Sequence, residues 1–146
     1  MRLGHSHVRF GSFQRYAFLG EIASLKRLLE YTVERHFPAL TGAADTPVAF
    51  LRAVIRRSAH LAATWMMAGF VHGVLNTDNM NVTGESFDYG PWRFLPTYDP
   101  NFTAAYFDEW GLYAFGKQPD TLAWNLTRLA EVQAVQPVVT VITLMR

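Results

Sequence analysis

The chain has 146 residues, and 50% of them are hydrophobic, 14% aromatic and 17% charged. This length suits one domain, and so apolar a composition excludes a disordered polar chain. Thirteen basic against twelve acidic residues leave a net charge of +1, which argues against nucleic-acid and membrane-surface partners. The absence of cysteine excludes disulfides and thiolate chemistry. The low share of charged residues indicates that a partner covers part of the apolar surface.

Two helices are predicted in the first half of the chain. Residues 1–20 mix Gly, His and Arg with isolated apolar residues, which is typical of a loop or a short extended segment. Apolar side chains at three-to-four spacing predict a helix over residues 21–36. A second helix is expected over residues 47–70, with Thr46 as its N-cap and Pro47 in its first turn. Because its second half is apolar almost all round, it should be the buried central helix.

The second half of the chain carries more turn residues. Residues 81–87 predict a small hairpin that turns at Thr83–Gly84. Prolines and glycines indicate a loop over residues 91–119, and residues 120–132 predict a third helix. The β-branched segment after Pro137 carries no assignment.

The cluster that suggests chemistry lies in the polar segment after the second helix. Asp78–Asn79 and Asp88 flank the predicted hairpin and could bring two hard oxygen ligands together, as magnesium requires. The alternative is that they are ordinary turn residues. Protein kinases place an Asp base, an Asn and a second Asp in similar order, but the kinase spacing H-R-D-x-x-x-x-N is absent here. His72 should orient this loop by hydrogen bonding.

Four segments together resemble one known family. They are SHVRFGSF (6–13), HGVLNTDNMNVTGESFDYGP (72–91), YDPNF (98–102), and YAFGKQP with WNLTRLA (113–130). They are similar to the SelO family of protein adenylyltransferases, which are pseudokinases. The resemblance implies an α+β, mostly helical fold that forms the C-lobe portion of a protein-kinase-like domain with one small β-hairpin. It also implies transfer of AMP from ATP to Ser, Thr or Tyr hydroxyls of protein substrates.

The resemblance assigns roles to individual residues. Asp78 matches the family's proton acceptor, and Asn79 and Asp88 match its two magnesium ligands, Asp88 also lying at the ATP. Arg9, and Arg2 seven residues before it, match two arginines that contact the nucleotide phosphates. Mg²⁺ is therefore the expected cofactor, with ATP and hydroxyl-bearing proteins as the expected partners.

The sequence also departs from the family. It has no G-x-G-x-x-G, and its two lysines, Lys26 and Lys117, do not lie on a predicted strand. We therefore expect residues 1–131 to be a kinase-like fragment that lacks the N-lobe and the C-terminal region, followed by a divergent tail at 132–146. The alternative function is a catalytically inactive remnant that binds nucleotide or a partner. A cytoplasmic location is expected if the source is bacterial.

Overall fold

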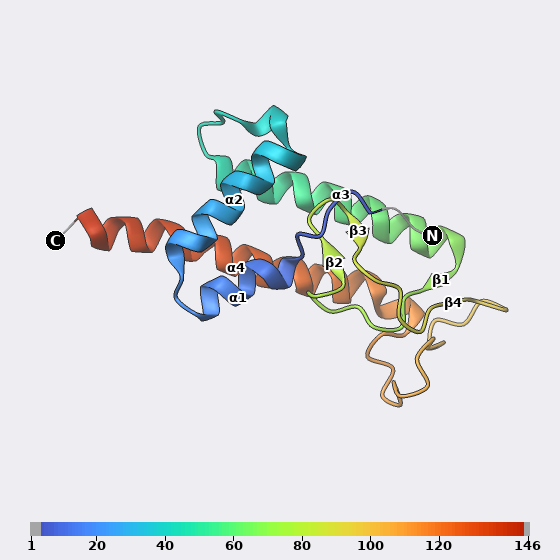
Figure 1. Cartoon of the computed structure of the whole chain (residues 1–146). Helices are drawn as coiled ribbons and strands as arrows, with labels where there is room; N and C mark the ends of the chain where they lie inside the picture. The colour runs from blue at the N-terminus through green and yellow to red at the C-terminus, as the bar shows by residue number, and fades with distance from the viewer. Residues whose placement is uncertain (1–3, 145–146) are drawn as a thin grey trace.

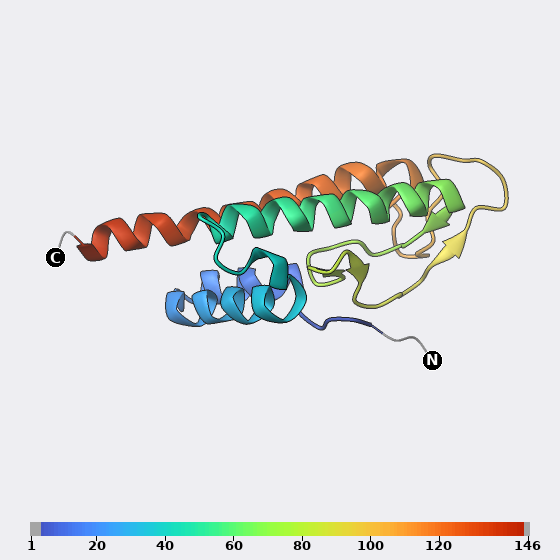
Figure 2. The same cartoon turned by 90° about the horizontal axis from the view of Figure 1, so that it is seen from above.

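The computed structural model describes residues 4–144, with side chains described as far as Gln133. Two long helices, α3 and α4, lie side by side, the shorter α1 packs on α4, and α2 packs on α1 (Figures 1 and 2). The described helices are α1 Phe10–Phe18, α2 Ile22–His36, α3 Thr46–Ala68 and α4 Gln118–Leu144, with short 3-10 turns at Pro38–Leu40 and Phe115–Lys117. The strands are β1 Phe70–Val71, β2 Met80–Asn81, β3 Glu85–Ser86 and β4 Arg93–Phe94. The predicted mostly helical α+β class is confirmed, whereas the relation to a kinase C-lobe stays a prediction.

The first helix, α1, lies where a loop or extended segment was predicted. Phe10 and Phe13 are three residues apart and fully buried, so they place one face of α1 in the core. The ring of Phe13 packs at 5.7 Å from that of Phe50 on α3. The short apolar pattern among Gly, Ser and Gln hid this helix, and its tertiary contacts stabilise it.

The second and third helices were predicted in nearly the right place. In α2 the buried side chains repeat at the expected spacing. The N-cap of α3, however, is Asp45 and not Thr46, because the Asp45 carboxylate accepts a hydrogen bond from the Val48 N–H at 3.2 Å. Gly69 ends α3 in the left-handed region, at φ 65°.

The prediction that the second half of α3 is buried all round was wrong. Ala62 and Trp65 are buried, but the side chain of Met67 is 89% exposed. Among the described residues, α3 packs on α4, on β1 and on the 3-10 turn at Pro38–Leu40, and these contacts leave the side chain of Met67 in solvent. Met67 is therefore no core residue.

The last helix is longer than predicted. Helix α4 begins at Gln118 and continues through Pro137 to Leu144, so the unassigned β-branched segment extends the helix. Proline has a helix-compatible φ and removes one backbone hydrogen bond, which a long helix can tolerate. Among the described residues, no helix is long and apolar enough to cross a lipid bilayer.

Both small sheets lie next to the polar segment. The hairpin was predicted correctly: β2 pairs antiparallel with β3, and Gly84 in its turn has φ 78°. The pairing of β1 with β4 was not predicted, because Phe70 was assigned to the preceding helix and Arg93–Phe94 to a loop. Residues 72–79 connect β1 of one sheet to β2 of the other.

Candidate active site

The loop that carries Asp78 is anchored by its own side chains and by α1. The Asn76 side chain accepts a hydrogen bond from the Asp78 N–H at 2.9 Å, and its backbone carbonyl accepts one from the Asn79 N–H at 3.0 Å. The Gly11 N–H in the first turn of α1 donates to the Thr77 carbonyl at 3.0 Å. Asp78 is therefore held against the start of α1.

Arg9, immediately before α1, faces this loop. Its Nη1 lies 3.6 Å from Asp78 Oδ1, and its Cζ lies 4.5 Å from the centre of the Phe87 ring. The Arg9 backbone also forms a bridge with Asn81 of β2. Two of the residues predicted to contact substrate, Arg9 and Asp78, are thus neighbours. Arg2, the other predicted phosphate contact, lies outside the described residues.

The predicted metal ligands Asn79 and Asp88 meet across the base of the hairpin. The Asn79 Nδ2 donates to Asp88 Oδ1 at 2.5 Å, and the Phe87 N–H donates to the Asn79 carbonyl at 2.7 Å. Asn79 is buried, whereas Asp88 is exposed. The hairpin therefore presents one buried amide and one solvent-facing carboxylate at the same point.

These two side chains have the donor set that magnesium prefers. Both offer hard oxygens, and from the described residues Asn79 Oδ1 receives one long hydrogen bond, 3.4 Å, from the Asn76 N–H. Over residues 4–144 there is no group of three His, Asp or Glu side chains that could hold a metal alone. An ion bound by Asn79 and Asp88 would take its remaining ligands from water and substrate phosphates, as Mg²⁺ commonly does.

His72 has the contacts expected of a positioning residue. It is fully buried, and its Nε2 lies 2.6 Å from Ser86 Oγ and 3.0 Å from the Asp88 carbonyl oxygen. The Ser86 hydroxyl also donates to the Asp88 carbonyl. The backbone of Asp88 is thereby fixed from the loop and from β3.

Sequence reasoning missed Gln118, which supports His72 from the start of α4. Gln118 is 1% exposed; its Oε1 accepts from the His72 N–H at 2.9 Å, and its Nε2 donates to the Phe70 carbonyl at 2.9 Å. The Gln118 side chain thereby hydrogen-bonds two backbone groups of the segment that leads into the loop. No local signal could have found it, because the partners are more than 40 residues apart in sequence.

An open pocket of about 390 Å³ lies at Asp78. It is lined by Arg9, Gly11, Ser12, Arg15, Tyr16 and Asp78. The Asp78 side chain is 65% exposed, so a hydroxyl group on a large partner can reach it.

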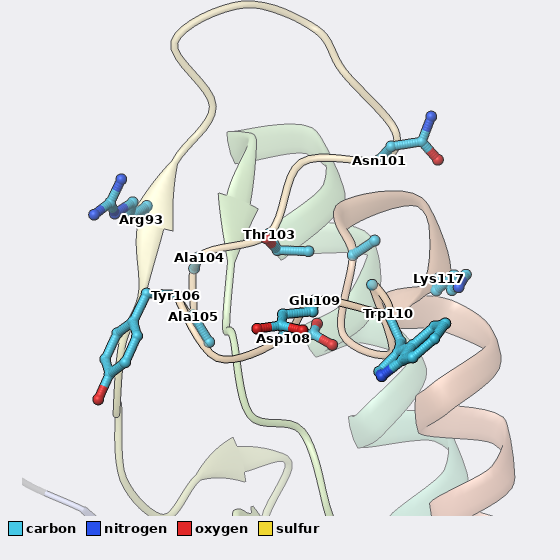
Figure 3. Close-up of a pocket in the computed structure, with 12 residues that line it drawn as sticks. Arg93, Asn101, Thr103, Ala104, Ala105, Tyr106, Asp108, Glu109, Trp110 and Lys117 are labelled. Atoms are coloured by element: carbon cyan, nitrogen blue, oxygen red, sulfur yellow. The ribbon is translucent and has the colours of Figure 1, made fainter.

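A second pocket, of about 510 Å³, lies in the loop before α4 and was not predicted (Figure 3). Tyr106 and Trp110 at its rim are more than 90% exposed. The Asp108 carboxylate accepts from the backbone N–H groups of Leu112 and Tyr113 at 2.7 and 2.8 Å, so it shapes the loop. Burial and the nearby Asp108 charge raise the pKa of the Tyr113 hydroxyl.

Known proteins are similar in sequence to this chain over most of its length. The family model described as "Protein adenylyltransferase SelO" matches residues 1–145. The chain is 49% identical over 132 residues to the protein nucleotidyltransferase YdiU of Synechocystis sp., covering 88% of the chain and 28% of that relative. It is 48% identical over 129 residues to that of Trichormus variabilis, and 48% over 130 residues to that of Mycobacterium sp. (strain KMS), covering 88% and 89% of the chain and 27% of each relative.

The chain therefore belongs to the SelO family. It spans about a quarter of the length of the curated relatives that it matches.

Proposed function

We propose that this chain carries the base and metal-binding part of a magnesium-dependent protein adenylyltransferase. The reaction would move AMP from ATP to a Ser, Thr or Tyr hydroxyl of another protein. The observation that carries the proposal is the pairing of Asp78 with Arg9 at 3.6 Å, next to Asn79, which contacts Asp88 across the base of the hairpin. Membership of a family whose model is described as a protein adenylyltransferase supports it.

In this reaction the acceptor hydroxyl oxygen bonds to the α-phosphorus of ATP, and the bond from that phosphorus to the pyrophosphate oxygen breaks. Asp78 would accept the hydroxyl proton, and pyrophosphate would leave with the electron pair. Carboxylates serve as general bases when they lie within hydrogen-bond reach of the proton they remove. The exposure of the Asp78 side chain supports this role, because the acceptor belongs to a macromolecule.

The remaining residues would neutralise charge on the phosphates. A guanidinium pairs with phosphate through parallel charge-assisted hydrogen bonds, so Arg9 would turn from Asp78 to the nucleotide when ATP binds. Asn79 and Asp88 would hold Mg²⁺, which when bound supplies positive charge to the phosphate oxygens. A contact from Arg2 is proposed on the resemblance alone.

A specific observation favours the second candidate, a catalytically inactive nucleotide- or partner-binding remnant. Lys26 lines a groove between α2 and α3, and Lys117 lines the pocket in Figure 3. Neither lysine lines the pocket at Asp78, so neither is placed to hold nucleotide phosphates beside the proposed base. Under this candidate, the chain binds ATP or a partner but transfers nothing.

The test is transfer from ATP and Mg²⁺ to a mixture of hydroxyl-bearing proteins, read by mass spectrometry. We expect adducts with the mass of an adenylyl group, not a phosphoryl group. Asp78→Asn keeps the side-chain shape but removes the base, so transfer should fall at least about 100-fold. Asp99→Asn, in an exposed loop, is the matched control and should transfer normally. Full transfer by Asp78→Asn would contradict the proposal, and ATP binding without any transfer would favour the inactive remnant.

A further inference from the structure

The pocket at Asp78 contains more positive than negative charge. Among the described residues, two arginines, Arg9 and Arg15, line it together with one carboxylate residue, Asp78. Arg9 is engaged by Asp78 and by the Phe87 ring. The Arg15 side chain has no ion pair or hydrogen bond with any other residue in the described part of the chain. One cation in the pocket is therefore available to an external anion.

Arg15 lies further along α1 than Arg9. Helix α1 starts beside the β2–β3 hairpin and runs away from it (Figure 1). With a rise of 1.5 Å per residue, Arg15 is displaced from Arg9 by about 9 Å along the helix axis. Gly11, which contacts the Asp78 loop, is four residues before Arg15 and lies on the same face of the helix. Arg15 thus stands one turn beyond the point where α1 meets Asp78.

This position separates Arg15 from the residues expected to bind phosphate. Asn79 and Asp88 are at the hairpin, and Arg9 stacks on Phe87, which precedes Asp88. Arg15 is at the opposite end of α1, in its last turn. An anion that approaches Asp78 from this end would belong to the acceptor and not to the nucleotide.

We propose that Arg15 binds a carboxylate side chain of the protein substrate close to its acceptor hydroxyl. The inference rests on the proposed function, which takes Asp78 as the residue that receives that hydroxyl. Arginine recognises carboxylates through two parallel N–H···O bonds, and the surplus positive charge of the pocket complements an acidic peptide. Segments with Asp or Glu beside Ser, Thr or Tyr are therefore the preferred substrate class.

A structural role alone could also explain a cation at this position. A positive side chain in the last turn of a helix interacts favourably with the helix dipole. Such a role would change the stability of α1 but could not give the chain a preference between acidic and basic peptides. Peptide preference is therefore the property to measure.

The experiment is fluorescence anisotropy with two labelled heptapeptides, in which Tyr is flanked on both sides by Glu or on both sides by Lys. No ATP is present. The parent chain should bind the Glu peptide about fivefold more tightly, the upper range for a partly exposed ion pair. Arg15→Glu should reverse the preference, and Arg15→Gln should abolish it. Arg52→Glu, an exposed position on α3, is the matched control and should behave like the parent.

Several outcomes would overturn the inference. They are equal binding of both peptides by the parent, no binding of either by a parent that circular dichroism shows to be folded, and an unchanged preference in Arg15→Glu. A fourth is weaker ATP binding by Arg15→Glu with unchanged peptide preference, which would assign Arg15 to the phosphates. Because the peptide assay needs neither ATP nor transfer, failure of the adenylyl-transfer assay is distinguishable from failure here.

Discussion

Gly11 leaves the space that the Asp78 carboxylate occupies. A Cβ on Gly11 would lie 2.2 Å from Asp78 Oδ1 and 2.9 Å from Asp78 Cγ. The same glycine donates its backbone N–H to Thr77, one residue before Asp78. The first turn of α1 therefore fixes both the loop backbone and the room for its carboxylate.

Gly11→Ala should separate stability from activity. Alanine is favoured over glycine in a helix by about 1 kcal/mol, and the group it would displace is the end of a side chain that can rotate. The free energy of unfolding, measured with urea, should be unchanged or higher. Adenylyl transfer should fall by about 100-fold, because a base moved by 1 Å or more loses its alignment.

Gly4→Ala is the control for this prediction. Among the described residues, a Cβ on Gly4 would have one neighbour, the Ser6 carbonyl oxygen at 3.8 Å, so neither stability nor transfer should change. Wild-type transfer by Gly11→Ala would show that the position of Asp78 does not depend on Gly11.

Asp88→Ala should abolish magnesium-dependent binding of ATP. The substitution removes the carboxylate that contacts Asn79, so a cation would keep a single amide oxygen from this pair. Isothermal titration calorimetry with ATP, with and without Mg²⁺, measures the effect. The parent should bind more tightly with Mg²⁺, and the variant should bind equally in both conditions.

Glu34→Ala, on the exposed side of α2, is the matched control and should keep the magnesium effect. If Asp88→Ala still bound ATP more tightly with Mg²⁺, Asp88 would not be a magnesium ligand. Asn79 and Asp88 would then be turn residues of the hairpin.

The predictable parts of this fold are those that depend on local patterns. The α2 periodicity and the Gly84 turn are short-range features, and each was assigned near its observed place. The start of α1 was missed because Phe10 and Phe13 acquire their buried face only from distant partners such as Phe50. The formation of α1 therefore depends on long-range packing, which the local sequence pattern does not reveal.

The candidate site shows the same division. Asp78, Asn79 and Asp88 were identified from the motif, and the structure brings Asn79 and Asp88 into contact. The supporting hydrogen bonds of Gln118 and the proximity of Arg15 to Asp78 were not predictable, because both depend on how helices pack around the loop. The motif identified the candidate residues, and the fold supplies their surroundings.

The segment before Arg9 should lose stability in acid through Glu85. The His5 backbone N–H lies 3.2 Å from Glu85 Oε2, His5 Nδ1 lies 2.8 Å from Oε1, and the Thr83 hydroxyl donates to Oε2 at 3.0 Å. Burial by itself would raise the pKa of Glu85, but these hydrogen bonds outweigh it and hold the pKa below the ordinary value of 4.5. The folded state therefore binds fewer protons than the unfolded state as the pH falls through 4.5.

The resulting stabilisation is fully present above pH 4.5 and is lost as the pH falls through the lowered pKa of Glu85. Glu85→Gln should lower the free energy of unfolding at neutral pH by less than about 1 kcal/mol, as for other partly exposed pairs. The difference from the parent should shrink in acid, which urea unfolding at a series of pH values measures. Glu30→Gln, an exposed position on α2, is the control and should leave the pH dependence of the free energy of unfolding unchanged. If the difference in this free energy between Glu85→Gln and the parent stayed constant as the pH fell, the assignment would be contradicted.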